Sequence, residues 1–325
     1  MPKMPLSVDS YTNYCRSIKN RSEKTVSEYE HDLLTFFRYI KAYNDGITVN
    51  EENLHEVDIS TIGMKEISEI TSEDIMRFLS YAAKDRKNSA VTRSRKLSSI
   101  KGFFKYLVTV RKELKENPAA DIDAPKKKAS LPKFLNLDES LALLDAVEKD
   151  VENPYRERDY CIITLFLNCG MRLSELTGLS LPDLDSELRS MRVVGKGNKE
   201  RVIYLNEACA DAIRKYIAVR GKQGEIKDKD ALFISRNHRR ISNQMVQKIV
   251  YKYLEMADLG NKHYSVHKLR HTAATLMYQT GKVDVRVLKD ILGHEQLNTT
   301  QIYTHVSDKG MEDAMKQNPL SKKKK

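Results

Sequence analysis

His267, Arg270, His294 and Tyr303 follow one another in a stretch that reads HKLRHTAATLMYQTGKVDVRVLKDILGHEQLNTTQIY. An arginine side chain can bind two phosphate oxygens at once and does not lose its charge. A histidine accepts or donates a proton near neutral pH, and a tyrosine hydroxyl can be a covalent nucleophile. Together, these residue types predict an attack on a phosphodiester.

A first helix is expected to position His267 and Arg270. It begins near Ser265, a good N-cap residue, and Gly281 is expected to end it. Its apolar positions recur at three- and four-residue spacing and are Val266, Leu269, Ala273, Leu276 and Met277. Because His267 and Arg270 lie three residues apart, they are neighbours on the surface of this helix.

Two further helices are expected to carry the remaining two side chains. The second begins at Asp284 and stops at a glycine, so that His294 lies just past its end. Its inward-facing residues are expected to be Val287, Leu288, Ile291 and Leu292. A third, short helix, capped by Asn298 or Thr299, would present Tyr303.

Each of these residues also has an ordinary structural explanation. A tyrosine such as Tyr303 in a short helix is most often a half-buried packing residue. His267 and His271 have the spacing of a metal-binding pair, but no acidic residue or cysteine is spaced to complete a zinc site. The chemical interpretation therefore rests on the ordered set, and we expect neither a metal nor a cofactor.

The spacing of the set resembles the C-terminal signature of the tyrosine site-specific recombinases: His267-x-x-Arg270, then Leu292-Gly293-His294, then Tyr303 nine residues on. The segment TTQIYTHV, from Thr299 to Val306, is especially similar to the Xer type, which resolves chromosome dimers. The resemblance implies an arginine motif and a lysine on a β-hairpin earlier in the chain.

An arginine motif is present in GMRLSELTGLSLPDLD, from Gly170 to Asp185. Arg172 is expected at the start of a short helix, where Glu175 can brace it. An exposed Arg–Glu pair alone would contribute less than about 1 kcal/mol. The resemblance implies that Arg172 is the first phosphate-binding arginine and that Glu175 supports it.

A β-hairpin is predicted by an apolar run that ends at Val194, the turn Gly195-Lys196-Gly197-Asn198-Lys199, and the returning RVIYL. In the family, the hairpin lysine reaches into the DNA minor groove and protonates the leaving 5′ oxygen. The match places this lysine at Lys196, with Lys199 as the less favoured position. Without the other motifs, the turn would be interpreted as a solvated basic loop.

Composition limits the class of protein. The chain has 325 residues, a net charge of +11 and a pI of about 9.2, which allow two domains and favour a polyanionic partner. Ribosomal, membrane-surface and RNA-binding proteins can have a similar net positive charge. The four cysteines form no CxxC pair, and neither a signal sequence nor a membrane-spanning run is apparent. A cytoplasmic protein fits these features.

We expect a mainly α-helical fold with a small β-hairpin in the catalytic domain, arranged as a two-domain DNA clamp. The expected parts are a helical core-binding (SAM-like) domain at 1–116, a basic proline-containing linker at 117–132, a catalytic domain at 133–318 and a disordered basic tail at 319–325. The first domain is expected to be mainly loop at 44–70. In the second, helices are expected at 138–149, 154–170, 206–220 and 243–257, with a short strand at 231–235.

Basic side chains outside the catalytic set are the candidates for DNA contacts. A helix that begins near Ala90 carries several of them on the face opposite its apolar residues, where acidic residues are scarce. The candidates are Arg93, Arg95, Lys96, Lys101, Lys199, Arg239 and Arg240. A solvated basic surface is the alternative interpretation.

The resemblance implies DNA strand exchange without metal or ATP through a 3′-phosphotyrosine intermediate. The catalytic set is Arg172, Lys196, His267, Arg270, His294 and Tyr303. The implied partners are double-stranded DNA and three further protomers, as a homo- or hetero-tetramer on two sites. A paralogous recombinase and a DNA translocase are further partners that the sequence leaves open, and no membrane is expected.

Resolution of chromosome dimers at a dif-like site is the expected role. A mobile-element or phage integrase would share the catalytic set, although it often carries an additional N-terminal domain for which we see no room. A type IB topoisomerase would relax supercoils without a specific site. A non-catalytic DNA-binding regulator would not need all six catalytic residue types.

Overall fold

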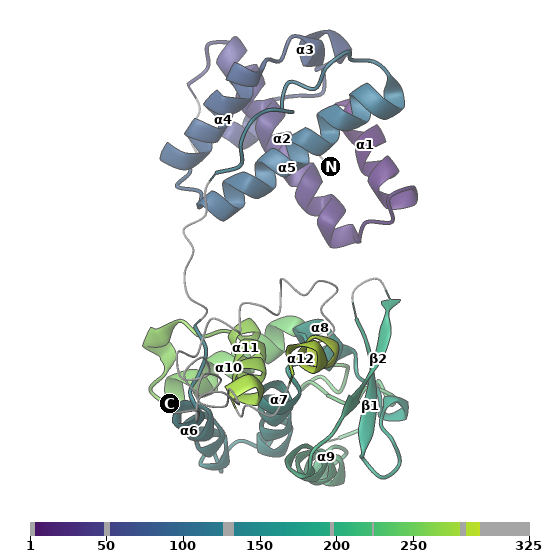
Figure 1. Ribbon diagram of the computed structural model, residues 1–325, viewed down its shortest axis with the longest axis vertical. Helices are drawn as coiled ribbons and strands as arrows, with labels where there is room; N and C mark the ends of the chain where they lie inside the picture. Colours follow the sequence, from purple (N-terminus) through teal and green to yellow (C-terminus); the bar gives the residue numbers. More distant parts are fainter. Residues whose placement is uncertain are drawn as a thin grey trace, which may run out of the picture. The chain divides into compact units, whose positions relative to one another are not determined.

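The computed structural model describes residues 4–48, 53–125, 133–195, 198–222, 224–279 and 284–292. The chain divides into two compact units, Met1–Ser130 and Leu131–Lys325. Both consist mainly of helices, and the sheet among the described residues is one two-stranded antiparallel hairpin (Figure 1). The predicted fold class is therefore confirmed, while the finer domain borders stay a prediction.

The described part of the first unit contains five α-helices. They are α1 (Leu6–Ser17), α2 (Glu23–Asn44), α3 (Met64–Ser68), α4 (Ser72–Lys84) and α5 (Ala90–Tyr106), with a 3-10 turn η1 (Leu54–Glu56) and a π-helical turn η2 (Leu107–Arg111). The side chains of Ser22, Thr71 and Ser89 accept hydrogen bonds from backbone N–H groups at the starts of α2, α4 and α5. The predicted loop at 44–70 also contains α3 and η1, because apolar side chains such as Ile67 pack into the core.

Aromatic rings join α2, α4 and α5. Phe36 and Phe37 on α2, Phe78 on α4 and Phe103 on α5 are fully buried. The rings of Phe36 and Phe78 meet edge to face with their centroids 5.2 Å apart. Phe37 and Phe103 meet in the same way at 5.5 Å. Such pairs add about 1 kcal/mol each to the burial of the rings, which lie in the core of this unit.

A buried carboxylate, Asp32 on α2, binds two of the basic side chains of α5 that were predicted to contact DNA. It accepts hydrogen bonds from Nη1 of Arg95 (2.6 Å), Nζ of Lys96 (3.1 Å) and Oγ of Ser99 (2.9 Å). Lys96 is only 5% exposed, and burial lowers its pKa although the carboxylate of Asp32 opposes that shift. Lys96 is therefore an internal ion-pair partner and not a DNA contact.

Replacing Lys96 by methionine is expected to lower the free energy of unfolding by about 3 kcal/mol, because it removes one cation from a buried carboxylate. Urea unfolding followed by circular dichroism measures this change. Lys105→Met, at an exposed position of the same helix, is the control and is expected to change stability by less than about 0.5 kcal/mol. A Lys96→Met variant of unchanged stability but weaker DNA binding would restore Lys96 as a DNA contact.

The first residues of the predicted linker pack against the first unit. Ala119 is fully buried in its core, and Nζ of Lys101 donates to the carbonyl of Ala120 at 2.8 Å. Residues 117–122 are therefore part of this unit, and Lys101 binds its backbone. The basic segment 126–128 lies outside the described residues.

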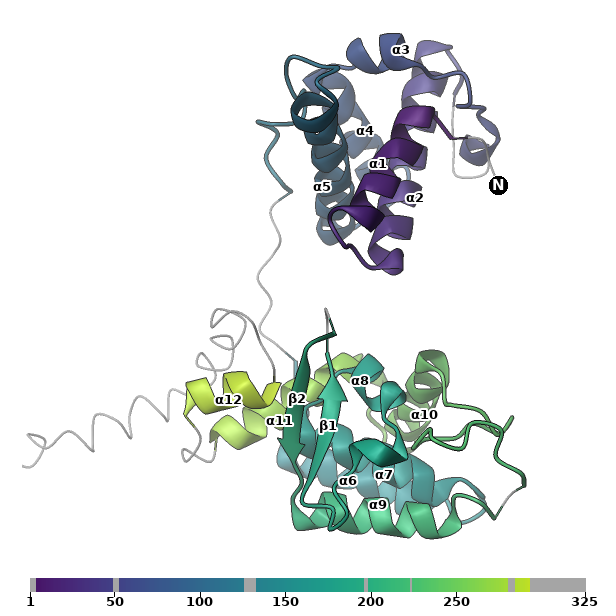
Figure 2. The same ribbon diagram turned by 90° about the vertical axis from the view of Figure 1, so that its right-hand side faces the viewer.

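The second unit is built around α7 (Arg156–Cys169), most of whose side chains are buried. Helices α6, α9 and α11 pack against α7 (Figures 1 and 2). The other elements are α6 (Leu137–Glu148), α8 (Leu173–Gly178), η3 (Leu181–Asp183), β1 (Ser190–Val194), β2 (Glu200–Tyr204), α9 (Glu207–Val219), α10 (Asn243–Met256), η5 (Gly260–Lys262), α11 (Val266–Gln279) and α12 (Val285–Leu292). Within the described ranges, no helix has the length and apolar character that crossing a membrane requires.

An apolar residue is exposed on each of α6 and α12, and on α12 that residue, Val287, was predicted to face inward. Leu141 on α6 is 51% exposed, whereas Leu143 is fully buried. Val287 on α12 is 52% exposed, whereas Leu288 is fully buried. Both helices contain more apolar residues than one face requires, so the surrounding helices decide which of them become buried.

The strand prediction for residues 231–235 is wrong. This segment makes two isolated bridges, one between Ala231 and Ser180 and one between Ile234 and Arg240. Its apolar residues are buried from 231 to 234, and a short buried apolar run does not distinguish a strand from an irregular segment.

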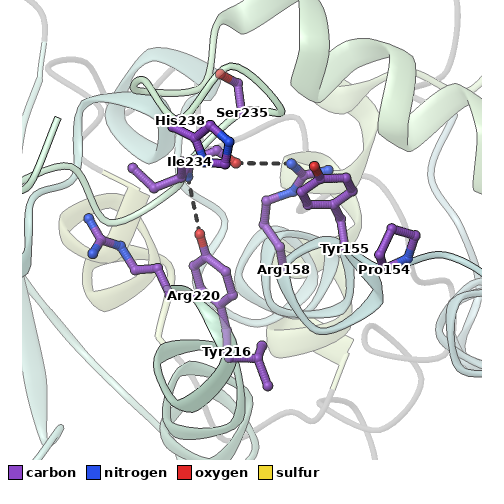
Figure 3. A pocket seen from close by; sticks show the side chains of 9 residues that line it. Pro154, Tyr155, Arg158, Tyr216, Arg220, Ile234, Ser235 and His238 are labelled. Atoms are coloured by element: carbon purple, nitrogen blue, oxygen red, sulfur yellow. Dashed lines mark hydrogen bonds between the residues drawn. The ribbon is translucent and has the colours of Figure 1, made fainter. Parts of the chain in front are cut away.

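Side chains from two helices hold this segment in place (Figure 3). The backbone N–H of Ile234 donates to the hydroxyl of Tyr216 at 3.1 Å, and Nη1 of Arg158 donates to the carbonyl of Ile234 at 2.9 Å. The pocket between them has a volume of only about 20 Å³, which is room for about one water molecule. Arg158 and Tyr216 therefore use their polar groups to hold the backbone of Ile234.

Candidate active site

Arg172 lies at the junction between α7 and α8. Gly170 ends α7 in the left-handed conformation (φ 58°), which residues with a Cβ atom adopt less readily. The backbone N–H of Arg172 donates to Oε2 of Glu175 at 2.7 Å, and its Nη1 donates to Oε1 at 2.7 Å. The predicted glycine stop and the predicted Arg172–Glu175 pair are both present.

Glu175 is a buried anion between two arginines. Its carboxylate has no exposed area, and Nη1 and Nη2 of Arg201 donate to its two oxygens at 2.6 and 2.9 Å. Burial alone would raise the pKa of Glu175, but the hydrogen bonds from Arg201 and Arg172 outweigh it and lower that pKa to about 2. Glu175 is therefore charged at physiological pH and can hold Arg172 in a fixed orientation.

The hairpin approaches this same pair. The N–H of Gly195 donates to the carbonyl of Lys199 at 2.7 Å across the turn. A Cβ atom at Gly195 would lie 3.3 Å from Oε1 of Glu175 and 3.7 Å from Nη1 of Arg172. Lys196, the predicted general acid, follows Gly195 directly in sequence but lies outside the described residues.

Arg270 is buried on α11 and joins two other elements. It is 3% exposed, and its Nη1 and Nη2 donate to the carbonyls of Gly170 (2.7 Å) and Leu292 (2.6 Å). One guanidinium thus links the end of α7, which leads to Arg172, with the end of α12. His294 follows two residues after Leu292 and lies outside the described residues.

His267 lies three residues before Arg270 on α11. Burial lowers the pKa of His267, and the positive charges of Arg270, Lys268 and Arg172 lower it further. The neutral imidazole is therefore favoured near neutral pH, and it can accept a proton. The ring of His271 lies edge to face with that of His267 at 5.0 Å between centroids, and no group of three or more His, Cys, Asp or Glu within the described ranges is arranged to hold a metal ion.

One pocket brings together three of the six predicted catalytic side chains. Its lining consists of Met171, Arg172, Leu173, Gln247, Ser265, Val266, His267 and Arg270. Two guanidinium groups and a neutral imidazole suit an anion that must be bound and a proton that must be moved. Tyr303, like Lys196 and His294, lies outside the described residues. No sequence signal marked Gln247, which reaches the pocket from α10.

Arg240, a predicted DNA contact, also binds main-chain groups within the protein. Its Nη1 donates to the carbonyls of Gly178 (2.6 Å) and Leu179 (2.7 Å), which end α8. Such bonds satisfy carbonyl groups that a helix leaves without intrahelical partners. Arg239 and Lys199 are exposed and stay predictions, as do the partly buried Arg93 and Arg240.

Arg201 is a residue of the site that the sequence analysis missed. Along β2, Arg201 and Ile203 are less exposed than their neighbours, so both point to the covered face of the hairpin. The alternation in RVIYL was the available signal, since a charged residue at an inward strand position needs an internal partner. Here that partner is Glu175.

Residues 133–310 match the phage integrase family, and residues 40–110 match the N-terminal SAM-like domain of phage integrases. The first match alone spans more than half of the chain. The chain therefore belongs to the phage integrase family, the tyrosine recombinases, as its motifs predicted.

Within this family, the chain is similar over nearly its whole length to proteins named tyrosine recombinase XerC. Identity to that of Caldanaerobacter subterraneus subsp. tengcongensis is 44% over 319 residues, which cover 98% of this chain and 88% of the relative. Identity to that of Thermodesulfovibrio yellowstonii is 35% over 320 residues, which cover 97% of each.

Two solved structures have the same fold. XerH site-specific recombinase bound to a palindromic difH substrate superposes with a TM-score of 0.69 at 21% identity, covering 96% of this chain and 95% of XerH. The Tn1549 transposon integrase in complex with transposon right end DNA superposes with a TM-score of 0.68 at 18% identity, covering 96% of this chain and 98% of the integrase chain. These likenesses agree with the helical two-unit architecture.

Proposed function

We propose that the chain is a site-specific recombinase that cuts and rejoins double-stranded DNA through a 3′-phosphotyrosine intermediate. The supporting observation is the pocket in which Arg172, Arg270 and His267 meet. Negative charge builds up on the phosphate oxygens when a nucleophile attacks a phosphodiester. Fixed cationic donors in a partly buried site stabilise that charge more strongly than water does.

Tyr303 is the proposed nucleophile. Its phenolic oxygen forms a bond to the scissile phosphorus, and the bond from phosphorus to the 5′ oxygen of the next nucleotide breaks. Arg172, Arg270 and His294 donate hydrogen bonds to the non-bridging oxygens. The phosphotyrosyl bond retains the energy of the broken linkage, so a 5′-hydroxyl can attack it and rejoin the DNA without ATP.

Two proton transfers accompany the cleavage. His267, which favours its neutral form, accepts the phenolic proton or positions the phenol. Lys196 donates a proton to the leaving 5′ oxygen. No step of this sequence uses a metal or another cofactor.

The proposed biological role is resolution of chromosome dimers at a dif-like site. Near full-length similarity to proteins named XerC and the fold shared with XerH bound to difH support it. Four protomers on two duplexes would form the working assembly. A paralogous recombinase and a DNA translocase are the further partners to test.

Recombination on paired sites tests the role. Purified protein, alone and with a paralogue from the same genome, is incubated with a plasmid that carries two directly repeated candidate dimer-resolution sites. Excision of the intervening segment is the expected result. A second plasmid carries the two ends of a mobile element, and excision on this plasmid alone would favour the integrase alternative. DNA binding without strand exchange on either plasmid would favour the regulator.

A further inference from the structure

Arg201 connects three segments of the second unit. Its Nη1 and Nη2 bind both oxygens of Glu175, and its Nε donates to the carbonyl of Ile291 at 3.3 Å. The side chain is only 16% exposed, while the carboxylate that it binds is fully buried. A two-point contact between a planar guanidinium and a carboxylate fixes orientation as well as distance.

Each of these segments leads directly to a proposed catalytic residue. Strand β2 begins one residue before Arg201 and follows the turn that contains Lys196. Glu175 holds Arg172 through two hydrogen bonds. Ile291 lies in the last turn of α12, three residues before His294.

The three connections differ in what else supports them. Without Arg201, Glu175 would still bind Arg172 within α8, and α12 would still be held by the bond from Arg270 to Leu292. The bidentate bond between the hairpin and Glu175, however, would be lost. Loss of this bidentate bond therefore affects the hairpin most, and the close approach of Gly195 to Glu175 would be the hairpin's remaining contact with that residue.

We propose that Arg201 is a positioning residue for strand cleavage: it fixes strand β2 against Glu175, and with it the hairpin to whose turn the proposed general acid belongs. This inference rests on the proposed recombinase function. We assign Arg201 no contact with the DNA phosphate, because its side chain is only 16% exposed and does not line the pocket of Arg172, His267 and Arg270.

A substrate that needs no proton donor separates positioning from general instability. Single-turnover cleavage is measured on a suicide duplex with the ordinary 5′ oxygen and on one with sulfur at the bridging 5′ position. A thiolate leaves without protonation, so a general acid matters little for the sulfur substrate. Arg201→Met is expected to slow cleavage of the oxygen substrate by about 10²-fold and that of the sulfur substrate by less than about 10-fold.

Two further variants complete the design. Arg192→Ala removes an arginine from the other strand of the same hairpin, where it is 54% exposed and makes only exposed or partly exposed ion pairs with Asp183 and Glu200. It is expected to cleave both substrates at the wild-type rate. Arg201→Lys keeps the charge but not the two-point contact, and it is expected to restore part of the rate on the oxygen substrate.

If Arg201→Met slows cleavage of both substrates equally, while the wild-type protein cleaves both, the positioning role alone would be overturned. Unchanged cleavage by Arg201→Met would overturn it as well. A wild-type protein that forms no covalent complex on either substrate would overturn the proposed recombinase function and this inference together.

Discussion

Arg270→Ala is expected to reduce single-turnover DNA cleavage by about 10³-fold, the loss typical of removing a charged group that stabilises a phosphoryl-transfer transition state. Arg270 lies at the pocket together with Arg172 and His267. Its Nη1 and Nη2 bind the carbonyls of Gly170 and Leu292, so its guanidinium has a fixed orientation. Covalent trapping under single-turnover conditions measures the loss.

The same two hydrogen bonds make Arg270 important for stability. Arg270→Ala leaves both carbonyls without this partner, at a cost of about 1–3 kcal/mol each if they stay buried. Arg270→Lys keeps a donor and the charge, so its free energy of unfolding should be higher than that of Arg270→Ala. Its cleavage should stay low, because an ammonium lacks the planar fork. Circular dichroism and DNA binding establish that each variant is folded.

Arg214→Ala is the matched control for Arg270. Arg214 lies on α9 and is 61% exposed, with only an exposed ion pair to Asp211. Its loss is expected to leave cleavage within about twofold of wild type, because exposed pairs contribute little. A folded Arg270→Lys or Arg270→Ala variant that cleaves at the wild-type rate would remove Arg270 from the catalytic set.

Local signals predicted most helix ends correctly, because a cap depends on residues a few positions apart. At the start of α12, the carboxylate of Asp284 accepts a hydrogen bond from the backbone N–H of Arg286 at 2.6 Å, as its predicted N-cap role requires. Gly170 ends α7 in the same local way. The hairpin of β1 and β2 follows from a turn sequence that permits a tight reversal.

Partners far apart in the sequence explain the contacts that the sequence did not predict. Lys96 binds Asp32, which lies 64 residues away, and Arg240 binds the carbonyl of Gly178, which lies 62 residues away. The sequence shows that these side chains are positively charged, but burial against an acceptor depends on packing between helices. The exposure of Val287 has the same origin, since neighbouring elements select the buried face of α12.

The candidate site was predictable as a set of residues but not as a geometry. The motifs identified Arg172, His267 and Arg270, which line one pocket. They did not indicate that Arg270 binds two main-chain carbonyls or that Arg201 shares Glu175. Those contacts join elements whose approach is determined by the core of the second unit.

Tyr303→Phe is expected to abolish covalent attachment to DNA while leaving DNA binding within about twofold. Phenylalanine keeps the ring but lacks the oxygen that forms the bond to phosphorus. No charge is removed, so the phosphate contacts that supply most nonspecific affinity are unchanged. The loss should be complete, because the other proposed catalytic residues act on the phosphate or on protons and offer no replacement nucleophile.

Covalent trapping on a nicked duplex with a candidate dimer-resolution site would be the first measurement. One duplex is labelled on the 5′ side of the scissile phosphate and another on the 3′ side, and a metal chelator is present throughout. A denaturing gel should show a shifted band for the wild-type protein with the 5′-side label only, and no such band for Tyr303→Phe. That result would establish a tyrosine joined to a 3′ phosphate without metal. A shifted band that persists in Tyr303→Phe, or that carries the 3′-side label, would contradict the proposed chemistry.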